Sequence, residues 1–151
     1  MHYRERLWAP ASWWGIGLFF AVSFTTVVGF TVSPWVGLVA GAVTTAAVAG
    51  ALLRYGSVAV IVDDTGLTAG GSLLEWPWLG EVEPLDAAAT RRLLGPEADR
   101  AAHLVTRGYL RTAVRVGVED PADPHPYWLV STRRPRELAA AVAAARSSMQ
   151  R

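Results

Sequence analysis

Closely spaced arginines give this sequence its clearest chemical signal. Arg133, Arg134 and Arg136 stand together at the predicted start of a C-terminal helix. The first backbone N–H groups of a helix are unpaired, and guanidinium groups bind phosphate through a planar fork of donors. The segment is therefore a candidate contact for an anion or a lipid headgroup. The alternative is a solvated surface in which these arginines pair with nearby carboxylates.

Other reactive side chains show no recognisable catalytic pattern. His2, His103 and His125 lack the spacing of metal ligands, cysteine is absent, and no serine has a Gly-x-Ser-x-Gly context. No glycine pattern for nucleotide phosphates is present. We therefore expect no catalytic, cofactor-binding or metal-binding residues, and no cofactor. The carboxylates that could serve an enzyme are Asp63, Asp64 and Glu75.

Charge is divided unevenly along the chain. Residues 55–90 hold six acidic side chains and no basic ones, whereas residues 91–151 hold eleven arginines and six acids. Ion pairs between the two halves would neutralise this division. The alternative is a basic face toward anionic lipid headgroups. A net charge of +1 lacks the basic excess typical of nucleic-acid binders, so nucleic acid is not an expected partner.

A long block of uncharged residues lies near the N-terminus of the sequence. The 47 residues between Arg6 and Arg54 contain no charged side chain, whereas soluble helices need a polar face. Pro34 divides the block into apolar spans at about residues 12–33 and 35–53. At ~1.5 Å per residue, both spans are long enough for a hydrocarbon core of ~30 Å. The sequence predicts a transmembrane helical hairpin at residues 12–54.

Arginines also set the expected orientation. Arg4, Arg6 and Arg54 flank the hairpin, while the turn at residues 31–35 has no charge. The positive-inside rule makes the flanks cytoplasmic. We expect a multi-pass protein of the plasma membrane, with the lipid bilayer as a partner, a cytoplasmic N-terminal tail at residues 1–11, and both termini in the cytoplasm.

Small residues recur at every fourth position of both predicted spans. Such ridges let helix backbones approach closely in lipid, and would either seal the hairpin or mediate a homodimer. The alternative is chance in an Ala- and Gly-rich chain. Because the spans lack ionisable side chains, a transport role is disfavoured. The ridge residues are Gly17, Ala21, Thr25 and Gly29 in the first span, and Gly37, Gly41, Thr45 and Ala49 in the second.

From residue 57 to residue 151, short alternating apolar runs between turn residues predict a cytoplasmic β-rich domain. Asp86 is a typical N-cap for a short helix that ends at Leu94. A last helix at residues 135–147 begins with proline, which suits the first helical position. The expected strands are 58–62, 67–69, 72–76, 80–85, 103–106, 113–119 and 127–131.

This order of elements defines the expected fold class, an α+β membrane protein. A two-helix transmembrane hairpin precedes a small antiparallel β roll or barrel, which a C-terminal helix caps. The roll is pleckstrin-homology-like, because in that fold the final helix plugs one end of a bent sheet. A different small barrel is the alternative.

Six segments of the chain together have a familiar pattern, and the most specific of them is Ser-Thr-Arg-Arg-Pro at residues 131–135. The other segments are Tyr3-Arg4-Glu5-Arg6-Leu7-Trp8 with Pro10, Leu85-Asp86-Ala87-Ala88, Leu94-Gly95-Pro96, Asp120-Pro121-Ala122-Asp123-Pro124 and Pro126-Tyr127-Trp128. With these segments the chain resembles the actinobacterial family known as domain of unknown function 3093 (DUF3093). The resemblance implies a membrane protein of high-GC Gram-positive bacteria, with no assigned activity or catalytic residues.

The function that we expect from the sequence is a membrane-anchored, non-enzymatic interaction domain. Tethering raises the effective concentration of the domain, so that weak contacts with a protein partner or with lipid headgroups would suffice. The alternatives are a membrane-associated enzyme and an accessory subunit of a larger membrane complex.

Overall fold

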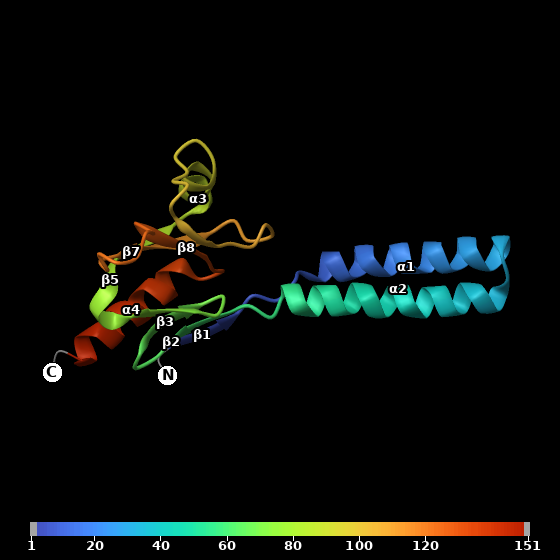
Figure 1. Cartoon of the computed structure of the whole chain (residues 1–151), viewed down its shortest axis with the longest axis horizontal. Coiled ribbons are helices and arrows are strands. Elements are labelled where there is room, and N and C mark those ends of the chain that lie inside the picture. Colours follow the sequence, from blue (N-terminus) through green and yellow to red (C-terminus); the bar gives the residue numbers. More distant parts are fainter. Residues whose placement is uncertain (1–2, 150–151) are drawn as a thin grey trace. The chain divides into compact units, whose positions relative to one another are not determined.

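The computed structural model describes residues 3–149 of the 151-residue chain. They form two compact units, and most of their elements are labelled in Figure 1. One unit contains residues 8–57, and the other joins the residues up to Leu7 with those from Val58 onward. The chain therefore leaves the second unit at Leu7 and returns to it at Val58.

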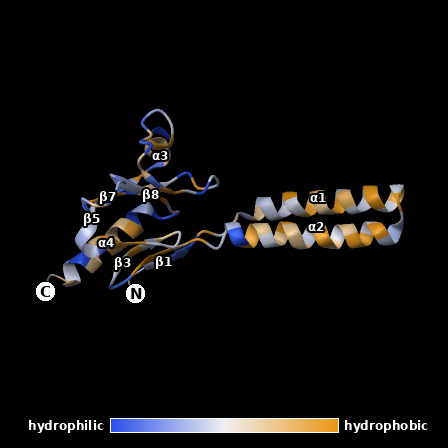
Figure 2. Cartoon of the chain, in the orientation of Figure 1, coloured by the Kyte–Doolittle hydropathy of each residue, from blue (hydrophilic) through white to orange (hydrophobic). Residues whose placement is uncertain are grey.

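The first unit is a pair of long apolar helices, α1 (Ala11–Thr31) and α2 (Pro34–Tyr55). Their bounds lie within two residues of the predicted spans. Pro34 stands in the first turn of α2, where its missing N–H costs no hydrogen bond, and the Ser33 hydroxyl accepts one from Val36 N at 3.3 Å. Hydrophobic residues dominate both helices (Figure 2), and each helix is long and apolar enough to cross a membrane.

Small residues bring α1 and α2 into close contact. A Cβ atom added to Gly37 would lie only 2.6 Å from the Cα atom of Gly29, and one added to Gly41 would overlap the Thr25 hydroxyl. Ala21, Gly37 and Gly41 are the buried residues of the two helices. At these positions the two ridges face each other.

The second unit begins with a four-stranded sheet, formed by β1 (Tyr3–Arg6), β2 (Ala59–Val62), β3 (Gly66–Ala69) and β4 (Ser72–Glu75). The strands lie in sequence order, and every neighbouring pair is antiparallel. Gly70 and Gly71, with φ angles of 63° and 93°, form the tight turn between β3 and β4.

Strand β1 corrects the prediction of an N-terminal tail at residues 1–11, of which residues 1–2 lie outside the described part. Tyr3 pairs with Val62, and Arg6 pairs with Ala59. The segment lacks an alternating apolar pattern, and its partner strand follows only after both helices, so no local signal predicts the pairing. The next residue, Leu7, is fully buried.

A second sheet contains β5 (Leu79–Leu85), β6 (His103–Val105), β7 (Ala113–Val118) and β8 (Tyr127–Ser131). Its order is β5-β7-β8-β6. The expectation of an antiparallel roll is wrong at one edge, because β6 and β8 are parallel. Strands β6 and β7 follow each other along the chain but are not adjacent in the sheet. The strand β8 forms a hairpin with β7 and lies between β6 and β7.

Two helices cover this second sheet: α3 (Ala87–Leu94) and α4 (Pro135–Met149). The main core joins both sheets to α4 through Leu138, Val142 and Ala145. The helix α3 packs on the other face, where its Ala89 and Leu93 contact a smaller cluster. All five residues of β8 are buried, because β8 is a central strand covered on both faces.

Candidate functional site

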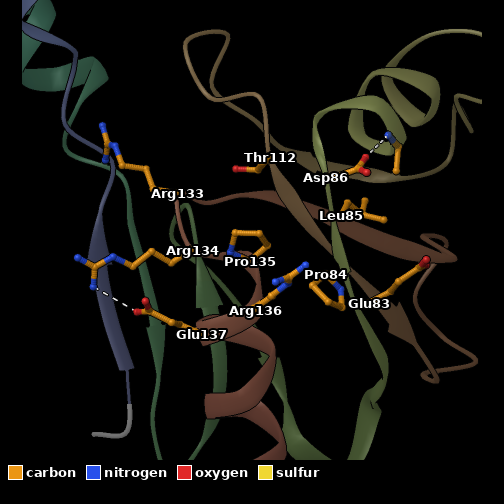
Figure 3. Close-up of a pocket in the computed structure, with 11 residues that line it drawn as sticks. Glu83, Pro84, Leu85, Asp86, Thr112, Arg133, Arg134, Pro135, Arg136 and Glu137 are labelled. Atoms are coloured by element: carbon orange, nitrogen blue, oxygen red, sulfur yellow. Dashed lines mark hydrogen bonds and ion pairs between the residues drawn. The ribbon is translucent and has the colours of Figure 1, made fainter.

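A cleft of about 560 Å³ brings the three predicted arginines together (Figure 3). Arg133 and Arg134 belong to the segment between β8 and α4, and Arg136 lies in the first turn of α4. The opposite wall comes from the end of β5 and from Asp86, which caps α3 by accepting a hydrogen bond from Ala89 N at 2.7 Å. We call this the arginine cleft. Its other lining residues are Glu83, Pro84, Leu85, Ala89, Thr112, Pro135 and Glu137.

The guanidinium groups in the arginine cleft point in different directions (Figure 3). Arg133 Nη1 donates to the carbonyl oxygen of Arg6 at 3.4 Å. Arg134 Nη1 lies 3.2 Å from Glu137 Oε2 in an exposed ion pair, and Arg136 extends toward Pro84. The three groups therefore do not converge on one phosphate-sized position. Their arrangement spreads positive charge over a surface.

The carboxylate of Glu5, on β1, ties the N-terminal strand to the segment after β8. It accepts hydrogen bonds from the Tyr3 hydroxyl at 2.9 Å, from Arg133 N at 3.0 Å, and from the Thr132 hydroxyl. Thr132 is fully buried, and its backbone N–H donates to Thr112 O at 3.2 Å. Its hydroxyl also accepts from Arg134 N at 3.0 Å. We call Glu5 and these donors the Glu5 junction.

Burial of Tyr3 in this junction raises the pKa of its hydroxyl to about 12. The charge of Glu5 and its hydrogen bond with Tyr3 act in the same direction, whereas Thr132 opposes them. A folded-state pKa above the ordinary value of 10 favours the neutral phenol. This contribution to stability is fully present below pH 10 and is lost as the pH rises toward 12.

The point where the chain leaves and re-enters the β unit is also fixed by hydrogen bonds. Leu7 N donates to Val58 O at 2.9 Å, which continues the β1–β2 ladder by one residue. The Tyr109 hydroxyl donates to Leu7 O. Both ends of the helical unit therefore emerge from one hydrogen-bonded site in the β unit.

Of the three carboxylates considered for an enzyme, Asp63 stabilises a turn. Asp63 Oδ1 accepts from the hydroxyl and the N–H of Thr65, at 2.6 and 2.9 Å, and these bonds hold the pKa of Asp63 below its usual range. This is an Asx turn between β2 and β3. Asp64 and Glu75 are exposed. Within residues 3–149, no group of three or more His, Cys, Asp or Glu side chains is arranged to hold a metal ion.

Residues 2–142 match the family described as "Protein of unknown function (DUF3093)". The chain belongs to this family. No curated protein and no solved structure is significantly similar to it.

In this DUF3093 protein, two of the segments that carry the resemblance meet at the Glu5 junction. Glu5 lies in the N-terminal segment, while Thr132 and Arg133 lie in Ser-Thr-Arg-Arg-Pro. The remaining polar groups of that segment are also used, because Ser131 Oγ accepts from Arg107 N at 3.1 Å. The segment therefore contacts several parts of the fold, and its two arginine side chains are exposed.

Further ridge residues of the DUF3093 protein lie outside the closest helix contact. Thr45 and Ala49 line an apolar groove of about 310 Å³ on the helical unit, together with Gly17 and Ala21. A Cβ atom added to Gly17 would lie 2.6 Å from Val48 Cγ1, so this glycine still permits close packing.

Two histidines that are distant in sequence form a cluster that the sequence did not predict, while His2 lies outside the described residues. His103 on β6 and His125 before β8 have ring centroids 5.2 Å apart. His125 Nδ1 lies 2.5 Å from Asp123 Oδ1, and the His103 ring lies 4.6 Å from that of Trp128. The parallel pairing of β6 with β8 makes them neighbours, and no sequence spacing signals this pairing.

We expect acid to destabilise the fold through His103. Burial, and secondarily the charge of His125, lower the pKa of His103 below 6.5, while Asp123 opposes this shift. The unfolded chain then binds the proton more readily, so this contribution to stability is present above pH 6.5 and is lost as the pH falls through the lowered pKa. NMR titration of the ring protons in the full-length chain measures the midpoint. In His125→Gln the midpoint should rise partway to 6.5; a wild-type midpoint at or above 6.5 would contradict the expectation.

Proposed function

We propose that this DUF3093 protein is a two-span membrane anchor for a cytoplasmic β-domain that acts by binding a protein partner or lipid headgroups rather than by catalysis. The helices α1 and α2 are the spans, the plasma membrane is the location, and both termini are cytoplasmic. The arginine cleft and the exposed face of β1 belong to the binding surface.

The pairing of β1 with β2 is the observation that carries this topology. The two strands are hydrogen-bonded neighbours, although α1 and α2 separate them along the chain. A sheet whose backbone pairs in this way lies on one side of a bilayer, because lipid-exposed sheet edges do not occur within its hydrocarbon core. A chain that leaves this sheet into lipid and returns to it crosses the membrane an even number of times.

The distribution of charge supports two crossings and a cytoplasmic domain. The helix α1 contains no charged residue, and α2 contains one, Arg54, in its last turn. Arg4 and Arg6 precede α1, and the turn between the helices has no charge. Basic residues confined to one end of a hairpin are typical of the end that lies on the cytoplasmic side.

The arrangement of the β unit supports the further proposal of a pleckstrin-homology-like roll. Its two four-stranded sheets and the C-terminal helix α4 share one core. The parallel β6–β8 pair and the placement of β1 before the hairpin are departures from that roll.

Single cysteines provide a direct test, because the chain contains none of its own. Val32→Cys in the turn and Ala98→Cys in the loop after α3 both introduce an exposed thiol. A membrane-impermeant maleimide should label Val32→Cys in intact cells and Ala98→Cys only after lysis. The wild-type chain should stay in the membrane fraction after alkaline carbonate extraction. Release by carbonate, or labelling of Ala98→Cys in intact cells, would overturn the proposed function.

A further inference from the structure

Four exposed arginines gather at one edge of the β unit. On β1 the side chains of Arg4 and Arg6 are exposed, while those of the alternate residues, Tyr3 and Glu5, are half-buried. Arg133 and Arg134 follow β8 and are also exposed. We call these four arginines the basic rim.

Hydrogen bonds hold the two parts of the basic rim together. Arg133 donates through Nη1 to the Arg6 carbonyl and through its backbone N–H to Glu5. Glu5 is half-buried at an alternate position of β1, whereas Arg4 and Arg6 are exposed. Glu137 forms an exposed pair with Arg134 that surface solvation weakens. The four arginines together with Glu5 and Glu137 carry a net positive charge.

Chain length keeps one end of the basic rim near the start of α1. Leu7 is the last residue of the β unit before the helical unit, and α1 begins at Ala11. Four residues span at most about 14 Å even when fully extended. On the returning side, the three steps from Tyr55 to Val58 span at most about 11 Å. Only a few residues therefore connect Arg6 to the start of α1, and Arg133 contacts the Arg6 carbonyl.

We propose that the basic rim binds the phosphate groups of anionic phospholipids in the bilayer that α1 and α2 cross. This inference rests on the proposed function, because the short connection to α1 brings the rim to a headgroup layer only if the helices span. Figure 3 shows the guanidinium groups of Arg133 and Arg134 apart from each other. A layer of many phosphates fits such separated groups, whereas a single free phosphate would require them to converge. Each arginine near an anionic surface adds about fivefold to the affinity.

Native mass spectrometry of the full-length chain in nonionic detergent provides the test. The chain is titrated with phosphatidylglycerol and with phosphatidylcholine of the same acyl chains. We expect wild type to bind phosphatidylglycerol at least about tenfold more tightly. In Arg6→Gln/Arg133→Gln the preference for phosphatidylglycerol should fall by at least about fivefold, because two of the four rim arginines are removed. Arg6→Lys/Arg133→Lys, which keeps the charge, should retain most of the preference, and high salt should remove it in every variant.

Arg91→Gln/Arg100→Gln is the matched control, because it removes the same charge from exposed positions in and after α3. It should retain the wild-type preference. Equal loss in this control, an unchanged preference in Arg6→Gln/Arg133→Gln, or displacement of the lipid by millimolar inorganic phosphate would overturn the proposal. Carbonate extraction of the wild-type membranes decides the proposed function separately.

Discussion

Replacement of Leu7 by alanine is expected to lower the free energy of unfolding of the β unit by about 3 kcal/mol, within the range of 2–5 kcal/mol for a buried Leu→Ala change. Leu7 is fully buried and belongs to the core that joins both sheets to α4. The truncation leaves a cavity at the point where the chain departs for α1. Hydrogen exchange of the β7 and β8 amides in the full-length chain measures the loss.

Leu73→Ala is the matched control for this experiment. Leu73 lies on β4 and is 47% exposed, so its truncation should cost well under 1 kcal/mol. If Leu7→Ala and Leu73→Ala have the same small effect, residues 3–7 do not belong to the β unit, and the topology argued from β1 loses its main support.

Leu7 also marks the limit of what the sequence predicts about this fold. Within residues 3–149, the helices and seven of the eight strands follow from local patterns, such as the alternation of Val114 and Val116 or the uncharged block between Arg6 and Arg54. Strand β1 has no such pattern. Its strand character depends on a partner beyond both helices, and a single sequence does not contain that pairing. The parallel pairing of β6 with β8 was not predictable for the same reason. It joins two strands that β7 separates along the chain, and no local pattern shows this pairing.

Part of the candidate site was also predictable from neighbouring residues in the sequence, whereas contacts between distant residues were not. Proximity along the chain was enough to predict that Arg133, Arg134 and Arg136 share a surface. The pair of Arg134 with Glu137 agrees with the alternative of nearby carboxylates. The contact of Arg133 with Glu5 was not predictable, because these residues are far apart in sequence and become neighbours only when β1 lies beside the segment after β8. The hypothesis of ion pairs between the acidic and basic halves accounts for Arg115 and Glu83, at 3.7 Å on neighbouring strands.

Glu5→Gln is expected to destabilise the β unit by about 2 kcal/mol, because hydrogen bonds to a charged group contribute about 1.5–3 kcal/mol each and the site is only half-buried. The amide has nearly the shape of the carboxylate, but its NH₂ group would meet a donor where Glu5 presents an acceptor. The pKa of Tyr3 should fall from about 12, and should stay above 10 because burial is its main cause. Denaturant titration and NMR of the tyrosine ring measure the two effects.

The matched control is Glu137→Gln, the same change in an exposed ion pair of the arginine cleft, which should cost less than about 0.5 kcal/mol. A double-mutant cycle with Thr132→Val then isolates the contact between β1 and the segment after β8. We expect a coupling free energy of about 1–2 kcal/mol, because Thr132→Val removes the hydrogen bond and Glu5→Gln removes the charge that strengthens it. Coupling near zero would mean that Glu5 and Thr132 stabilise the fold independently. The basic rim would then lose the junction that holds Arg6 and Arg133 in one surface.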